Sequence, residues 1–173
     1  MYRSIVLSGQ IASGTTTAAK TLAQKYNLEF HYAGDFFRSY MKSHNIPLYD
    51  KSQIPDDLDK KIDAELTNLA NSEKALVIDG HYIGYFTRNM SHVLRVLLTC
   101  DIEERVKRAA SRDQEKETAE DIKRREEGLD AKFRKLYTDE YYLDPKFFEL
   151  TIDTTLTSKE EVINLISQKF ENP

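Results

Sequence analysis

Short apolar runs alternate along the chain with segments of helical periodicity. Ile5–Leu7 is a β-branched run closed by Ser8 and Gly9, and Thr17–Tyr26 carries apolar residues on one helical face. Four further apolar runs predict strands: 28–32, 75–78, 93–98 and 150–152. Helical spacing predicts helices over 35–43, over 56–71 and after a capping box at 158–161. This alternation predicts an α/β fold with helices on both faces of a five-stranded parallel sheet, in three layers.

Length and composition limit the class of protein. With 173 residues and 40% hydrophobic positions, a single domain over residues 1–173 is expected. A net charge of −4 argues against a nucleic-acid partner, and no apolar run is long enough for a membrane span. Cys100 is the only cysteine, so we expect it to be a small buried residue in a protein of the reducing cytoplasm.

A glycine-containing turn follows the first predicted strand. The segment Gly9-Gln10-Ile11-Ala12-Ser13-Gly14-Thr15-Thr16-Thr17 matches the phosphate-loop pattern G-x-x-x-x-G-K-[ST] except at the lysine, where Thr15 stands. Glycines let successive backbone N–H groups point inward, and the helix that follows adds the positive end of its dipole. The strand-turn-helix context favours a polyphosphate site such as that for ATP over a turn without a ligand.

Two oxygen-bearing side chains suit a magnesium ion beside this loop. The hydroxyl of Thr16 occupies the position of the usual Mg²⁺ ligand, and Asp79 ends an apolar strand where a second carboxylate is expected. The missing lysine removes a charge from the phosphates, and Lys20 is a poor substitute because five residues rotate it about 140° around the helix. Arginines are the better candidates to supply this positive charge.

Arginines gather between residues 105 and 140. Arg105, Arg108 and Arg112 share one helical face, and Arg124 and Arg125 follow on a second predicted helix. A hairpin of these helices over the phosphate loop would form a lid whose guanidinium groups contact the transferring phosphoryl oxygens. The alternative is a solvated pair of helices with surface ion pairs, since acidic residues are equally dense here.

Several segments in this order resemble the nucleoside monophosphate kinases, and among them the short cytidylate kinases of archaea and some bacteria. The resemblance covers nearly the whole chain and extends beyond the phosphate loop. The matching segments are Ala33-Gly34-Asp35-Phe36-Phe37-Arg38, Ile62-Asp63, Val77-Ile78-Asp79-Gly80-His81, the arginine-rich region, Tyr137–Asp144 and Leu150–Thr155.

The resemblance implies transfer of the γ-phosphoryl group of ATP to CMP or dCMP, with Mg²⁺ as cofactor, by a monomer. It implies a helical monophosphate-binding insert over about 34–72 and a lid over about 105–140. The residues it assigns to ATP are Gly9 to Thr17, with Thr16 and Asp79 at the metal. Those assigned to the monophosphate are Asp35, Arg38, Asp63, Gly80, His81, Asp130 and Arg134, and those assigned to the lid as catalytic residues are Arg108, Arg112 and Arg124.

Two departures from the family pattern leave alternatives open. Thr15 replaces the lysine, which motivates a non-catalytic nucleotide-binding module as one alternative. His81 stands where similar sequences have arginine; it is either a polar loop residue or an acceptor contact whose titration would make activity depend on pH. AMP or UMP is the alternative acceptor, because a few hydrogen bonds decide base choice. Tyr32, Phe36, Phe37 and Tyr40 suit either the core or stacking on a base.

Overall fold

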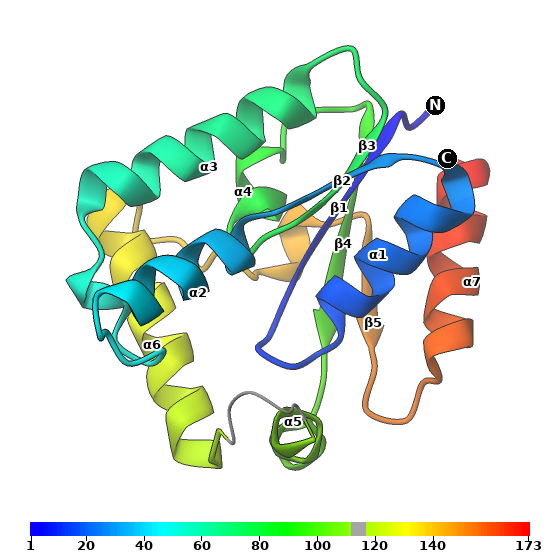
Figure 1. Ribbon diagram of the computed structural model, residues 1–173. Helices are drawn as coiled ribbons and strands as arrows, with labels where there is room; N and C mark the ends of the chain where they lie inside the picture. The colour runs from blue at the N-terminus through cyan, green and yellow to red at the C-terminus, as the bar shows by residue number, and fades with distance from the viewer. Residues whose placement is uncertain (112–116) are drawn as a thin grey trace.

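A parallel sheet lies at the centre of the computed structural model, which describes residues 1–111 and 117–173. Its five strands have the order β2-β3-β1-β4-β5 (Figure 1). Their bounds are β1 Ser4–Gly9, β2 Glu29–Tyr32, β3 Leu76–Asp79, β4 Val93–Thr99 and β5 Leu150–Asp153. All neighbouring pairs are parallel, and each strand overlaps the apolar run that predicts it. The predicted α/β sheet is confirmed.

Helices connect the strands on both faces of the sheet. Their bounds are α1 Thr15–Tyr26, α2 Ala33–Ser43, α3 Asp56–Asn71, α4 Ile83–Phe86, α5 Ile102–Ala110, α6 Ala119–Leu136 and α7 Lys159–Glu171. Two 3₁₀ turns, η1 Lys51–Gln53 and η2 Pro145–Phe147, join longer elements. The Ser158 side chain accepts the N–H of Glu161 and so caps α7 as expected, and a capping box of Thr118 and Asp121 opens α6.

The alternation of side chains along β1 explains the three layers. Ile5 and Leu7 point to one face, where α1 and α7 cover them, and Val6 points to the other face, beneath α3 and α4. A third apolar cluster joins Leu97 of β4 to α6 through residues such as Phe133. These strand residues are almost completely buried, which is why both faces of the strands are apolar in sequence.

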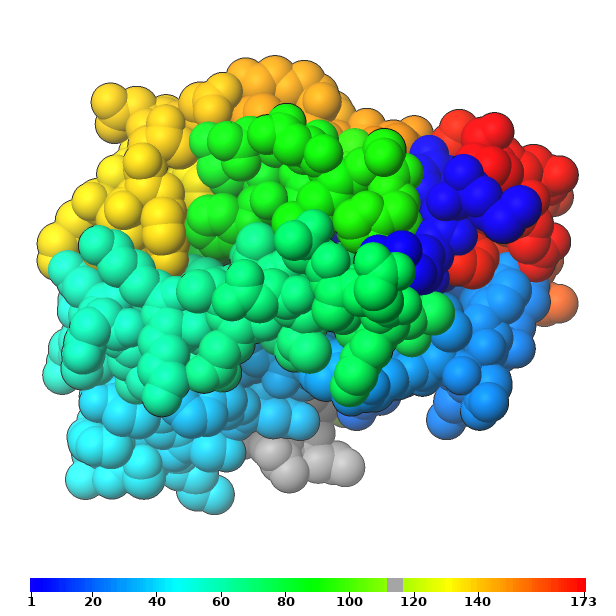
Figure 2. All heavy atoms as spheres, turned by 90° about the horizontal axis from the view of Figure 1, so that it is seen from above, coloured from blue at the N-terminus to red at the C-terminus, as the bar shows by residue number. Residues whose placement is uncertain are grey.

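Segments distant in sequence meet at one end of the molecule. In Figure 2 the later part of α6 lies against the start of α3, where Lys135 and Lys132 both contact the Asp56 carboxylate, at 2.6 and 2.7 Å. In the two described stretches, no helix combines the length and apolar character that crossing a bilayer requires.

The sheet topology brings the phosphate loop and β3 together. The central strand β1 pairs with β3, and the register sets Leu7 beside Asp79. The loop after Gly9 therefore begins next to the carboxyl end of β3. Ligands in open α/β sheets bind outside these carboxyl ends, so the fold sets the site here.

Candidate active site

The phosphate loop forms a tight backbone cradle between β1 and α1. Ala12 and Gly14 adopt left-handed conformations, with φ of 63° and 101°, and Gly14 precedes α1 without any side-chain cap. A Cβ on Gly9 would lie 2.5 Å from the Leu98 carbonyl oxygen, so only glycine fits there. The first N–H groups of α1 have no capping side chain and are available to an anion.

Thr16 and Asp79 meet beside this cradle. The Thr16 hydroxyl donates to Oδ2 of Asp79 at 2.5 Å, and the carboxylate is 4% exposed. Burial raises the pKa of Asp79 from its ordinary 3.8 to about 6, against the opposing effect of hydrogen bonds from Thr16 and Thr15. The structure therefore brings together the two side chains that the sequence analysis assigns to a metal ion.

The oxygen atoms at this position fit a magnesium ion that takes its other ligands from phosphate and water. Mg²⁺ in phosphoryl-transfer sites is bound through one or two protein oxygens and keeps several waters. The described residues contain no group of three or more His, Cys, Asp or Glu side chains that could hold a metal ion by themselves. The buried, partly desolvated carboxylate of Asp79 is well suited to a cation.

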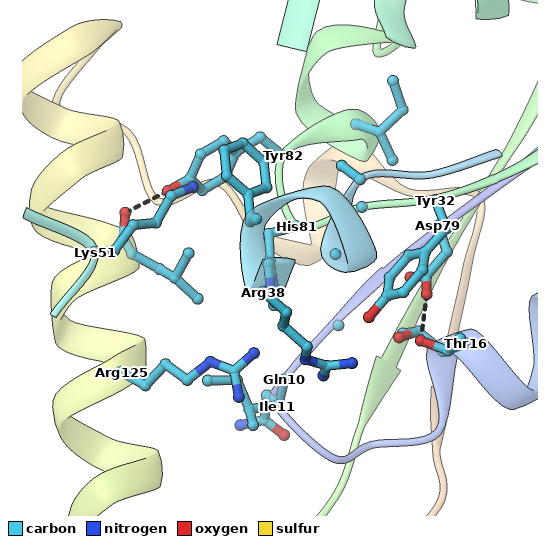
Figure 3. Close-up of a pocket in the computed structure, with 18 of the residues that line it drawn as sticks. Gln10, Ile11, Thr16, Tyr32, Arg38, Lys51, Asp79, His81, Tyr82 and Arg125 are labelled. Carbon is cyan, nitrogen blue, oxygen red and sulfur yellow. Dashed lines mark hydrogen bonds between the residues drawn. The ribbon is translucent and has the colours of Figure 1, made fainter. Parts of the chain in front are cut away.

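Cationic side chains from three different elements converge around His81. Arg38 extends from α2, Arg125 from α6 and Lys51 from η1, and Figure 3 shows the two guanidinium groups directed toward the same space above Gln10 and Ile11. Arg125 is 13% exposed and is held by both carboxylate oxygens of Glu117, at 3.0 and 3.2 Å. This concentration of positive charge favours an anion in the cavity.

The surroundings of His81 favour its neutral form. Burial is the largest cause and the charges of Arg125, Lys51 and Arg38 add to it, lowering the pKa of His81 from 6.5 to about 3. The expectation that His81 titrates near neutrality is therefore corrected for the protein without ligand. An imidazole surrounded by cations acts here as a hydrogen-bonding side chain and not as a pH switch.

One cavity joins these groups. It extends from the phosphate loop and Asp79 past Arg38 and Arg125 to Lys51 and Tyr82 (Figure 3). The predicted site residues that line it are Gly9, Gln10, Ile11, Ala12, Gly14, Thr15, Thr16, Thr17, Arg38, Asp63, Asp79, Gly80 and His81. The structure thus brings most of the predicted residues to one place, from four separate parts of the chain.

Arg108 lies on the other side of the phosphate loop. Its guanidinium donates to the carbonyl oxygen of Thr154 at 2.6 Å and to that of Ser13 at 3.4 Å, and Glu104 pairs with it at 3.1 Å. A second hollow lies here, bounded by Gly14, Thr17 and the loop before α7. Ser13 lines this hollow and not the first.

Four predicted residues stand outside both hollows. Asp130 and Arg134 pair with each other along α6 at 2.7 Å, and Asp35 is exposed in the first turn of α2. Arg124 is 55% exposed and pairs with Glu120 on the same helix. Helical i,i+4 pairing holds three of these side chains along the surface of α6, which corrects their expected placement. Arg112 lies outside the described residues.

Several residues that line the cavity are not among the predicted site residues. Arg125 follows Arg124 directly in sequence, so the pattern does not distinguish the two, and Lys51 lies in a short 3₁₀ turn with no periodicity to reveal it. Tyr32, Phe37 and Tyr82 also line the cavity. Of the aromatic residues weighed between core and base stacking, Tyr32 and Phe37 are therefore cavity residues, whereas Phe36 is 42% exposed.

Arg105 has a structural role. Its Nη1 donates to Glu126 at 2.6 Å and to the Ile11 carbonyl oxygen at 3.3 Å, while the same Glu126 oxygen accepts the N–H of Ile11 at 3.1 Å. These bonds tie α5 and α6 to the phosphate loop. Arg124 and Arg134 therefore form surface ion pairs, as the alternative interpretation of this region predicts. Arg105 instead forms a buried ion pair with Glu126.

A phosphate loop after the central strand of a parallel sheet, a Thr–Asp pair beside it and a cavity rich in arginine define a P-loop kinase. A family model described as an AAA domain matches residues 5–130. Cytidylate kinase from Sulfolobus acidocaldarius is 33% identical over 94% of this chain and 91% of its own length. Cytidylate kinase from Desulfurococcus amylolyticus is 33% identical over 94% and 89%. The chain belongs to the cytidylate kinase family of nucleoside monophosphate kinases.

Solved structures share the fold at low sequence identity. A gluconokinase from Sinorhizobium meliloti superposes with a TM-score of 0.66 at 15% identity, covering 98% of this chain and 94% of that one. Shikimate kinase from Acinetobacter baumannii, in complex with shikimate, gives 0.61 at 17% identity, covering 99% and 94%. These similarities establish the P-loop kinase fold alone.

Proposed function

We propose that this chain transfers the γ-phosphoryl group of ATP to the phosphate of CMP or dCMP, with Mg²⁺. The observation that carries the proposal is the single cavity that joins the phosphate loop to the converging side chains of Arg38 and Arg125. A phosphate donor at the loop and a phosphate acceptor at the arginines would lie end to end. The cytidylate kinases to which the chain is similar supply the identity of the acceptor.

The donor's phosphates bind in the backbone cradle. Free N–H groups at the start of α1 and the dipole of this helix favour the polyphosphate. Thr16 and Asp79 would hold Mg²⁺, which supplies charge neutralisation between the donor's phosphates when bound. The hollow beside Arg108, Thr154 and Gly14 adjoins the same loop and is assigned to the donor's nucleoside.

The acceptor's phosphate binds between Arg38 and Arg125. Two guanidinium groups from different helices can each form paired hydrogen bonds to phosphate oxygens. Neutral His81 lies among them and offers a further hydrogen bond without repelling either arginine. Because the chemistry needs no covalent intermediate, positioning and charge neutralisation by these groups account for catalysis. One chain supplies every group named here, so a monomer suffices.

Thr15 favours a second candidate, a nucleotide-binding module without turnover. An uncharged side chain at this position leaves the donor's phosphates without the usual lysine. The charge of Arg38 already acts on Asp79, where it opposes the burial that raises the carboxylate's pKa. Arg38 and Arg125 thus bring two positive charges to the cavity beside the loop, which favours the kinase.

Thr15→Lys is expected to strengthen MgATP binding by less than about tenfold, because the arginines already neutralise much of the phosphate charge. Titration calorimetry with MgATP measures the change, and Thr15→Met supplies similar length without charge. A lysine-specific gain of several hundredfold would show that the site lacks compensation and would support the module without turnover.

An acceptor panel tests the proposed function. The assay supplies MgATP with CMP, dCMP, UMP or AMP, and separates the nucleoside diphosphates formed. We expect kcat/KM to be highest for CMP or dCMP. Preference for UMP or AMP would retain the kinase and change its acceptor, whereas MgATP binding without any diphosphate product would replace the kinase by the binding module.

A further inference from the structure

Lys51 presents a fixed ammonium group at the end of the cavity farthest from the Thr16–Asp79 pair (Figure 3). The residue is only 8% exposed although it lies on a short 3₁₀ turn. Its Nζ is 2.9 Å from Oδ1 of the fully buried Asp59. Asp59 is itself held by Lys132, at 3.4 Å. This arrangement orients Lys51 and leaves part of its capacity to donate hydrogen bonds toward the cavity.

Asp63 lies one helical turn beyond Asp59 on α3 and lines the same cavity. The Tyr137 hydroxyl donates to its Oδ2 at 2.8 Å, which orients the carboxyl group. Burial raises the pKa of Asp63 to about 6, and the nearby charge of Lys51 and the Tyr137 hydrogen bond oppose this rise. In its ionised form the side chain accepts hydrogen bonds only.

The order of groups along the cavity assigns this end to the acceptor's base. Figure 3 shows Arg38 between Lys51 and the Thr16–Asp79 pair, with the guanidinium group of Arg125 reaching toward the same space. A monophosphate held by the two arginines, with its phosphate facing the loop, therefore directs its base away from the loop. Phe37 and Tyr82 also line the cavity, and Nζ of Lys51 lies over both rings, 4.6 and 4.8 Å from their centroids.

We propose that Lys51 and Asp63 recognise the amino-bearing edge of the acceptor base and thereby select cytosine over uracil. The inference rests on the proposed function and specifies its base selectivity. Cytosine presents an N4 amino donor beside the N3 acceptor, which is complementary to a carboxylate beside an ammonium group. Uracil presents an O4 acceptor and an N3–H donor. The Asp63 carboxylate would then face a carbonyl oxygen and the Lys51 ammonium group would face an N–H, so neither pair could form a hydrogen bond. Adenine shares the cytosine pattern at N6 and N1, so this pair of side chains does not by itself distinguish cytosine from adenine.

Asp63→Asn is expected to lower the ratio of kcat/KM for CMP to that for UMP by about 10- to 100-fold, the size of a lost or mismatched hydrogen bond to a charged group. An asparagine amide can donate to O4 of uracil as readily as it accepts from N4 of cytosine. Lys51→Gln alters the other half of the pair and is expected to shift the same ratio in the same direction.

Asp57→Asn is the matched control, because Asp57 is exposed on the same helix and is not among the residues that line this cavity. Its ratio should equal that of the wild type. Thermal unfolding of each variant checks the fold, and Lys51→Gln remains a separate test if Asp63→Asn does not fold.

The outcomes separate this inference from the proposed function. A wild type that phosphorylates no pyrimidine monophosphate overturns both. A wild type that prefers CMP, with Asp63→Asn and Lys51→Gln leaving the CMP to UMP ratio unchanged, overturns only the base recognition. Equal losses for CMP and UMP in both variants also overturn it, because they would assign the pair to the shape of the cavity or to phosphate binding.

Discussion

Replacing Arg125 with alanine is expected to lower kcat for CMP phosphorylation by about 10³, the magnitude typical of an arginine that stabilises a transferring phosphoryl group. Arg125 lies 13% exposed in the cavity and is oriented by both oxygens of Glu117. Charge spreads over the phosphoryl oxygens in the transition state, so a preorganised guanidinium acts there more strongly than on the bound substrates. The KM for CMP should rise much less than kcat falls.

Arg124→Ala is the neighbouring control. Arg124 is 55% exposed and pairs with Glu120 on the helix surface, so its loss should change kcat by less than about twofold. Steady-state kinetics of both variants with MgATP and CMP give the comparison. Equal losses in the two variants would mean that only the overall positive charge of α6 matters, and an active Arg125→Ala variant would remove this residue from the transition state.

Asp79→Asn is expected to reduce activity by about 10² or more while making the protein without ligand more stable. The carboxylate is positioned with Thr16 for a cation, and an amide supplies no negative charge to hold it. Burial raises the pKa of Asp79 from its ordinary 3.8 to about 6. The buried charge therefore destabilises the empty fold at neutral pH, and a neutral amide removes that cost.

The pH dependence of the stability gain follows from the same shift. Because the folded chain binds this proton more tightly than the unfolded chain, the contribution of Asp79 to the free energy of unfolding falls as pH rises from about 4 to about 6 and stays low above that. Asp79→Asn should raise the free energy of unfolding by on the order of 1–3 kcal/mol at pH 8. The difference should disappear near pH 4.

Urea unfolding at both pH values in the absence of nucleotide and Mg²⁺ measures this gain. Asp101→Asn is a suitable control, because Asp101 is an exposed residue just after strand β4 of the same sheet. A lower free energy of unfolding for Asp79→Asn than for the wild type at pH 8 would contradict this account. It would show that the carboxylate stabilises the phosphate loop in the absence of a cation.

The phosphate loop was predictable because its signal is local. Gly9 and Gly14 are required by close backbone approach and by a positive φ, and both requirements act within the strand-turn-helix segment itself. The strands were predictable for a similar reason, since burial on both faces leaves continuous apolar runs. Asp79 was predictable as a site residue because it lies at the end of such an apolar run.

The choice among arginines was not predictable in this way. Arg124 and Arg125 are adjacent in sequence, but about 100° of helical rotation sends one to solvent and the other to the cavity. Only the packing of α6 through Phe133 and Leu129 sets that rotation. Lys51 depends on still more distant contacts, because Asp59 and Lys132, from two other helices, hold the turn on which it lies.

The most direct test of the account is transfer of label from ATP radiolabelled at the γ-phosphate to CMP by the purified protein with Mg²⁺. The account predicts that the label appears in CDP, that product formation stops without Mg²⁺, and that little label appears as inorganic phosphate. Bound ATP with no labelled CDP, or release of the label only as inorganic phosphate, would contradict it.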